Sequence, residues 1–211
     1  PTGTTYSWAA PSVTGGLTGG TTGSGASSIT GTLTNPSSTA QTATYTVTPT
    51  AGSCPGATFT VTVTINPKPA VTNLTATVCS GVGFTSTPVD VTDGIVPSGT
   101  TYSWAAPSVT GGLTGGSTGS SASSISGTLN NPTLSPQTGT YTVTPSAGGC
   151  SGSTFTVTAT INPLPAAAIT PATVGICIGS STTLTASGGS SYVWNTGPTT
   201  AGITVSPTTA T

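Results

Sequence analysis

The chain has 211 residues, yet it carries one lysine (Lys68), two aspartates (Asp90 and Asp93) and no arginine, glutamate or histidine. Acid–base and triad catalysis need titratable side chains, and nucleic-acid binding needs many cationic ones, so the composition predicts neither an enzyme nor a nucleic-acid partner. No apolar run reaches the roughly 20 residues of a membrane-spanning helix. We also expect no cofactor.

The composition favours an ordered all-β protein. The chain is rich in Thr, Ser and Gly, as mucin-like stalks are, but 33% of its residues are hydrophobic. Trp and Tyr recur at fixed places, and Thr, Val and Ile, which fit a pleated half-buried surface, are abundant. We therefore expect β-sheet domains rather than a disordered segment.

One unit of sequence occurs twice. Residues 1–66 and 97–162 align at an offset of 96 without a gap, and 51 of the 66 positions are identical. The stretch Thr4–Gly20 recurs unchanged at Thr100–Gly116. A period of this length is typical of one small β domain, not of a solenoid turn.

Two proline-rich segments, Ile65–Pro69 and Ile161–Pro165, punctuate the repeat. Closely spaced prolines stiffen a chain and end strand pairing. We therefore expect a first domain at 1–68 without its N-terminal strands, a complete domain at 69–164, and a third at 165–211 without its C-terminal strands. The absence of methionine agrees with a processed product or a section of a longer polypeptide.

Several segments of the complete domain have the features of strands. In 139–145 and 153–162, apolar residues alternate with threonine, as in a strand with one face in a core and one in water. About seven short strands in about 96 residues are typical of an antiparallel β-sandwich of the immunoglobulin type. The other predicted strands are 70–78, 82–91, 100–105 and 122–130.

Aromatic side chains are expected to form the cores. The third strand of the complete domain supplies a tryptophan at the core centre, and the repeat supplies its equivalent. The expected core residues are Trp8, Tyr45 and Phe59 in the first domain, Trp104, Tyr141 and Phe155 in the second, and Trp194 in the third.

Four cysteines, Cys54, Cys79, Cys150 and Cys177, have no close pair of the kind that a zinc site needs. One falls early and one late in each unit, which indicates disulfides in an oxidising environment. Two pairings stay open, a Cys79–Cys150 bridge within the middle domain and staples between neighbouring domains, with free thiols as a third state. The two turns expected to hold Cys79 and Cys150 lie at opposite ends of a sandwich, whereas a bridge needs Cα atoms roughly 4.4–6.8 Å apart. Cys54 and Cys177 have their partners outside the sequence in both pairings.

Three further features are weak candidates for a functional role. Asp90 and Asp93 are a weak candidate for calcium, but this ion takes six to eight oxygens and Asp-Gly pairs favour turns, so we expect no metal. Lys68 is conceivable in an isopeptide bond with an aspartate, although no catalytic glutamate is present. Asn73-Leu74-Thr75 is an acceptable N-glycosylation triplet.

Threonine rows such as Thr58, Thr60, Thr62 and Thr64 coat one face of a strand. Threonine is a good polar residue for a solvated strand, and O-glycosylation, lateral packing in a fibre and ice binding are the alternatives. The Gly/Thr-rich loops Gly15–Ser28 and Gly111–Ser124 are candidates for gripping polysaccharide, although they contain no aromatic residue.

The motifs TYSWAAP, SISGTLNNP and QTGTYTVTPSAGGCSGSTFTVTATINPLP resemble the PKD-like repeats of giant cell-surface adhesins of the Bacteroidetes type. The tail CIGSSTTLTASGGSSYVWNTGPTTAGITVSPTTAT resembles the Ig-like repeats of the same proteins. The resemblance implies tandem PKD-like and Ig-like β-sandwiches, secretion by the type IX route and display at the cell surface. It does not extend to the immunoglobulin disulfide, whose second cysteine follows a tyrosine by two residues, because Cys150 follows Tyr141 by nine.

These observations predict an extracellular structural segment that holds a distal binding region away from the cell. Its partners are the neighbouring repeats, with self-association or surface glycans as further possibilities. A carbohydrate-binding module and a self-assembling filament subunit are the two alternative functions.

Overall fold

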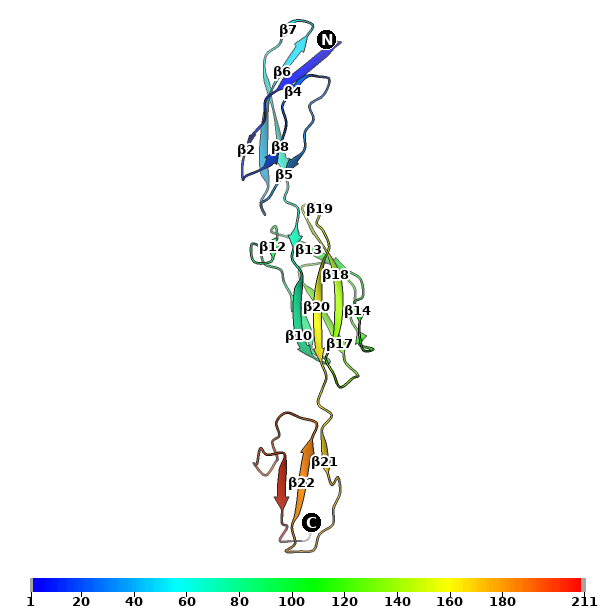
Figure 1. The fold of residues 1–211 in the computed structure, drawn as a ribbon. Helices are drawn as coiled ribbons and strands as arrows, with labels where there is room; N and C mark the ends of the chain where they lie inside the picture. The colour runs from blue at the N-terminus through cyan, green and yellow to red at the C-terminus, as the bar shows by residue number, and fades with distance from the viewer. Residues whose placement is uncertain (1, 210–211) are drawn as a thin grey trace.

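The computed structural model describes residues 2–209, which contain β-strands and no helix. The predicted all-β class is confirmed. Three bodies follow one another end to end in an elongated rod (Figure 1). We call them the first domain (2–68), the middle domain (69–164) and the third domain (165–209).

The middle domain has two facing sheets. The larger is seven-stranded with the path β10-β20-β18-β13-β16, and β14 and β19 also pair with β18. The smaller has the order β11-β17-β15, and β9 pairs with β12. The strands are β9 (Ala70–Val71), β10 (Leu74–Cys79), β11 (Gly83–Ser86), β12 (Gly94–Ile95), β13 (Thr101–Trp104), β14 (Ser108–Val109), β15 (Thr114–Gly115), β16 (Gly119–Ala122), β17 (Ile125–Asn130), β18 (Gln137–Ala147), β19 (Cys150–Ser151) and β20 (Phe155–Asn162).

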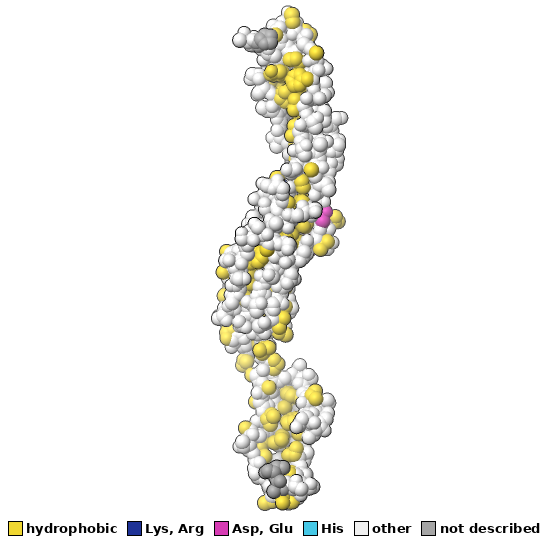
Figure 2. Space-filling view, turned by 180° about the vertical axis from the view of Figure 1, so that it is seen from behind, with side chains coloured by type: hydrophobic (Ala, Val, Ile, Leu, Met, Phe, Trp, Pro, Cys, Tyr) yellow, Lys and Arg dark blue, Asp and Glu magenta, His cyan; other side chains and the backbone are white. Residues whose placement is uncertain are grey.

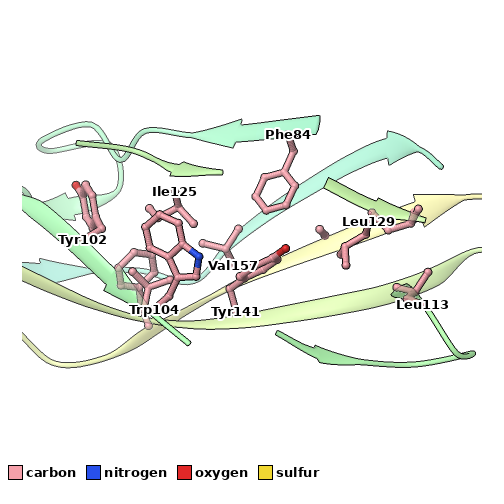
Figure 3. Close-up of a cluster of buried hydrophobic side chains, with 12 residues drawn as sticks. Phe84, Tyr102, Trp104, Leu113, Ile125, Leu129, Tyr141 and Val157 are labelled. Atoms are coloured by element: carbon pink, nitrogen blue, oxygen red, sulfur yellow. The ribbon is translucent and has the colours of Figure 1, made fainter. Parts of the chain in front are cut away.

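The core of the middle domain lies between these sheets (Figure 3). Apolar residues of β18 and β20 point inward and threonines point outward, because successive side chains of a strand face opposite ways. Phe84 of the small sheet meets Tyr141 of the large one edge-on, with ring centroids 5.4 Å apart. Trp104 is buried, and its indole N–H donates to the Ser117 carbonyl at 3.0 Å.

The strand pairing differs from a purely antiparallel sandwich at one place. β10 runs parallel to β20, with a register from Leu74 opposite Val157 to Cys79 opposite Asn162. Three predicted strands also differ in extent, and the one expected at 70–78 is divided between β9 and β10. The strand expected at 82–91 ends at Ser86, and the one expected at 122–130 is divided between β16 and β17.

A buried asparagine fixes the turn between β17 and β18. The Asn131 amide donates to the carbonyls of Ser135 and Ile161, both at 2.8 Å. Its side-chain oxygen accepts hydrogen bonds from the backbone N–H and hydroxyl of Thr133 at 2.9 and 2.7 Å. Asn35 makes the equivalent four bonds in the first domain. Asn131 is therefore a buried polar clamp as well as part of an Asn-Pro turn signal.

We expect Asn131→Ala to lower the free energy of unfolding of the middle domain by about 2–3 kcal/mol, because it leaves buried backbone groups without partners. The exposed neighbour Asn130 is the control, and Asn130→Ala should change stability by less than about 0.5 kcal/mol. Hydrogen exchange of middle-domain peptides in increasing urea measures the unfolding free energy of both variants. Equal losses of this free energy in the two variants would contradict the role of Asn131 as a clamp.

The first domain repeats much of this architecture. Its main sheet has the path β2-β6-β1-β4, with β7 and β8 also paired to β6, and β3 pairs with β5. The strands are β1 (Thr4–Trp8), β2 (Ser12–Val13), β3 (Thr18–Gly19), β4 (Gly23–Ala26), β5 (Leu33–Thr34), β6 (Gln41–Ala51), β7 (Cys54–Pro55) and β8 (Phe59–Ile65).

The first domain differs at β8, the equivalent of β20. Trp8 and Tyr45 are buried, but Phe59, which the sequence places in the core, is 40% exposed, whereas its equivalent Phe155 is 3% exposed. The physical reason is that β20 is covered by β10, while β8 pairs with β6 alone among the described strands.

The third domain is a three-stranded antiparallel sheet of β21 (Ala168–Thr170), β22 (Thr182–Ser187) and β23 (Gly202–Val205). None of the described residues from 166 to 209 is buried. Trp194, expected in a core, is half-buried, and its N–H donates to the Thr200 carbonyl at 2.8 Å. The exposure arises because this sheet has no second sheet opposite it within the described residues.

Candidate functional site

The outer face of the main sheet carries an ordered threonine array. Neighbouring strands lie about 4.8 Å apart, so residues in register form rows across the sheet. In the middle domain the rows are Thr75–Thr158–Thr140 and Thr77–Thr160–Thr138. In the first domain the pairs are Thr42–Thr64, Thr44–Thr62 and Thr46–Thr60. The Thr44 and Thr62 hydroxyl oxygens are 3.3 Å apart, so these two threonines hydrogen-bond to each other across the strands.

The Gly/Thr-rich loop of the middle domain is held against the protein. β15 pairs with β17 and β16 pairs with β13, and the Trp104 indole anchors the loop at Ser117. A shallow hollow of about 520 Å³ lies between this loop and the small sheet, lined mainly by glycine and by the hydroxyls of serine and threonine. Its one aromatic lining residue, Phe84, belongs to the core.

The strand register separates the two cysteines of the middle domain. Cys79 lies opposite Asn162 at one end of the large sheet, and Cys150 lies opposite Ala147 at the other. The 11 residues of β18 span this distance, which is roughly 30 Å at about 3.3 Å per residue. One disulfide cannot join them within the domain. All four cysteines are unbridged, and Cys54 occupies the position in the first domain that Cys150 occupies in the middle one.

The two aspartates accept hydrogen bonds from backbone N–H groups of their own loop. An Asp90 carboxylate oxygen accepts the Val96 backbone N–H at 2.9 Å, and an Asp93 oxygen accepts the Val89 N–H at 2.7 Å. No group of three or more metal-ligating side chains occurs among residues 2–209. Asn73, the predicted glycosylation residue, accepts the Thr156 N–H through its side-chain oxygen.

Asp90 also joins the first and middle domains. The Ser38 hydroxyl lies beside the Asp90 carboxylate, and its interaction, followed by the hydrogen bond from the Val96 N–H, lowers the pKa of Asp90. A hollow of about 290 Å³ at the same junction is lined by both domains, including Pro67 on one side and Gly148 on the other. Figure 2 shows the single acidic spot beside this junction on an otherwise uncharged face.

We expect the first junction to loosen in acid. Because the pKa of Asp90 in the folded chain lies below its ordinary value of 3.8, the contact with Ser38 is fully present above that value and is lost as the pH falls through the lowered one. The protection factors of peptides covering 36–41 and 88–96, which correct exchange for its own pH dependence, should fall together as the pH drops below about 3.8. In Asp90→Asn the exchange should no longer change in step with this titration, and Ser38→Ala should show the acid behaviour at neutral pH. Unchanged exchange in both variants would contradict the contact.

Sequence reasoning missed this junction, although a signal for it exists. The two copies differ at four successive positions, 37–40 against 133–136, the longest run of differences in the repeat. This run is the loop that faces the following domain. Leu134, the equivalent of Ser38, is 80% exposed, and Leu164 of the second linker is 61% exposed. The loop at the junction of the first and middle domains therefore has a different environment from its equivalent in the middle domain.

The described residues contain little else that is reactive. Lys68 is exposed in the first linker, and Tyr141 is a core residue whose pKa burial raises. No helix within residues 2–209 is long and apolar enough to cross a membrane.

The geometry thus defines a tandem array of small β-sandwich modules. The family model of the PKD-like domain matches residues 1–69 and 73–165. The chain belongs to the PKD-like domain family, whose members are typically extracellular and generally non-catalytic modules. No curated protein matches the chain significantly.

Proposed function

We propose that the chain is a stalk segment of a long extracellular adhesin or surface filament. It spaces a distal binding region from the cell, and it is exported by the type IX route like the Bacteroidetes adhesins that its motifs resemble. The observation that carries the proposal is the end-to-end order of the domains (Figure 1), with residues of both domains lining the first junction. A spacer needs length, and the end-to-end order of the domains supports this role.

Solution scattering of the 211-residue chain tests the rod. Each domain is roughly 35–40 Å long, judged from the 11 residues of β18, so three in line span about 120 Å. A rod of that length has a radius of gyration of about 35 Å, whereas a compact globule of this chain length has about 17 Å. A value near the smaller figure would overturn the proposal. Binding of the chain to a glycan array would favour the carbohydrate-binding alternative.

The threonine rows favour lateral packing in a fibre as the second candidate. Rows of methyl and hydroxyl groups on both copies of the sheet offer a repeating surface to a neighbouring filament. Negative-stain microscopy separates the two functions. Single rods at high concentration support the stalk, and bundles that disappear when Thr75 and Thr77 are changed to lysine support lateral packing.

The cysteine positions support staples between neighbouring domains. We define the N-terminal pole of the middle domain as the end that contacts the first domain, and the C-terminal pole as the opposite end. Cys150 belongs to the N-terminal pole, since Gly148 of the same turn faces Asn66 of the first domain, and Cys79 belongs to the C-terminal pole. In successive units, Cys79 of one domain therefore faces the Cys150 equivalent of the next.

A chain in which a second copy of 69–164 replaces the third domain tests this pairing. Two thiols join when they lose two electrons and two protons to an external oxidant, for which oxidised glutathione serves. We expect peptide mapping to find Cys79 of the first copy bridged to the Cys150 equivalent of the second. A bridge within one copy, or two free thiols after oxidation, would contradict the staple.

A further inference from the structure

The hydroxyl of Tyr141 is buried in the middle domain without a hydrogen-bond partner. Tyr141 is 0% exposed, and its hydroxyl oxygen has no partner within residues 2–209. Its ring packs edge-on against Phe84 in the core (Figure 3). A buried hydroxyl without a partner costs stability, which a phenylalanine at the same position would avoid. Tyr45, the equivalent in the first domain, has the same buried and unpartnered hydroxyl.

This hydroxyl lies directly behind the wall of the hollow beside the Gly/Thr-rich loop. A Cβ atom added at Gly127 would overlap the hydroxyl oxygen, and one added at Gly116 would lie 3.1 Å from it. Both glycines line the hollow of about 520 Å³. The Gly116 N–H donates to the Thr128 carbonyl at 2.9 Å, and β15 and β17 pair only in the two residues before this point. A small outward movement of Gly116 therefore opens the hydroxyl to the hollow at the cost of few hydrogen bonds.

The hollow offers neutral hydrogen-bonding groups. None of its lining residues is charged, so it presents no opposite charge to a phosphate or a carboxylate. Its volume lies within the roughly 300–1,000 Å³ of small-molecule sites. Four of the lining residues carry hydroxyl side chains and are exposed, namely Thr85, Ser117, Ser126 and Thr128. Such uncharged donors and acceptors match the hydroxyl groups of a neutral sugar.

We propose that the middle domain binds a neutral hexose-based saccharide in this hollow, and that one sugar hydroxyl meets the Tyr141 hydroxyl between Gly116 and Gly127. A phenol both donates and accepts a hydrogen bond, as a sugar hydroxyl does, so the pair satisfies the group that the core leaves unpartnered. The serine and threonine hydroxyls around the hollow hold the rest of the sugar.

A shallow site of this kind binds weakly, and copies of it on successive repeats bind one polysaccharide together by avidity. The first domain keeps three of the hydroxyl-bearing positions, as Thr21, Thr30 and Thr32. The inference gives the carbohydrate-binding alternative a defined site and rests on that alternative. It does not depend on the stalk, since solution scattering measures the rod and the experiment below measures binding.

Hydrogen exchange of the full chain tests the site, with oligosaccharides of a neutral glucan, a mannan and a galactan as probes. We expect at least one of the three to slow exchange in peptides covering 113–120 and 124–130, while exchange in the third domain stays unchanged as the internal reference. In Tyr141→Phe, the saccharide concentration that gives half of this protection should rise by about tenfold or more, because the sugar hydroxyl loses its partner. Without saccharide, this variant should be at least as stable as the unaltered chain, since it loses an unpartnered hydroxyl.

Tyr102→Phe is the matched control, because it removes a hydroxyl from the same core at a residue that does not line the hollow. It should leave the protection by saccharide unchanged. Three results would overturn the proposal. None of the three probes would slow exchange at the hollow, or Tyr141→Phe would bind the saccharide as well as the unaltered chain does. In the third case, Tyr141→Phe would lower stability in the absence of saccharide, which means that the hydroxyl serves the folded core itself.

Discussion

Phe155→Ala should lower the stability of the middle domain by about 3–4 kcal/mol, while the same change at Phe59 should lower that of the first domain by about 1 kcal/mol. Both residues follow Thr, begin the equivalent strand and meet a tyrosine edge-on, at ring-centroid distances of 6.2 and 6.3 Å. They differ in burial, because Phe155 is 3% exposed and Phe59 is 40% exposed. Loss of a buried ring leaves a cavity, whereas loss of a half-exposed ring leaves a site that water already reaches.

Native-state hydrogen exchange in increasing urea measures the two losses separately, since peptides of each domain report their own unfolding. The repeat supplies a matched control, because the substituted residue and its sequence neighbours are the same in both domains. Equal losses would mean that β8 is covered in solution and that the open face is not a property of the chain.

Much of the fold follows from the sequence. Strict alternation around Tyr141 and Phe155 predicted β18 and β20, and the repeat predicted that the first domain would share the strands. The direction of β10 was not predictable, because the alternation in LTATVC suits a parallel and an antiparallel neighbour equally well. Its pairing with β20 joins segments about 80 residues apart, and local pattern carries no information on such a choice. The exposure of Phe59 escaped prediction for the same reason, since it depends on a strand elsewhere.

The candidate surfaces were predictable in part. Cys79 and Cys150 lie at opposite ends of the sheet, as the strand order indicated, although they belong to β10 and β19 and not to turns. The approach of Ser38 to Asp90 was not predictable, because Ser38 is one of many serines and Asp90 resembles a turn residue. Comparison of the copies would have drawn attention to this loop, since 37–40 against 133–136 is the longest run of differences. In a tandem array each repeat contacts only its neighbours. The core of each repeat can therefore stay the same, while the loops at its ends differ to suit different neighbouring domains.

Gly119→Ala should lower the stability of the middle domain by about 3 kcal/mol, near the upper limit for overpacking a core. Gly119 of β16 lies opposite Trp104 of β13, and a Cβ atom at this glycine would overlap the indole ring. The ring cannot retreat without breaking the bond from its N–H to Ser117 and disturbing the core around Val143. A residue that resembles loop punctuation in the sequence is therefore a packing position. The same overlap exists between Gly23 and Trp8, so Gly23→Ala should destabilise the first domain similarly.

Gly112→Ala separates this collision from ordinary backbone strain. Gly112 has a φ of +70° and no atom within 4 Å of an added Cβ, so its substitution should cost about 1 kcal/mol through strain alone. Urea unfolding monitored by hydrogen exchange gives both values, and the emission of Trp104 should shift to longer wavelength in Gly119→Ala only. If Gly119→Ala proved no more destabilising than Gly112→Ala, the Trp104 indole would have room to move. The conclusion that β16 packs tightly against this ring would then be wrong.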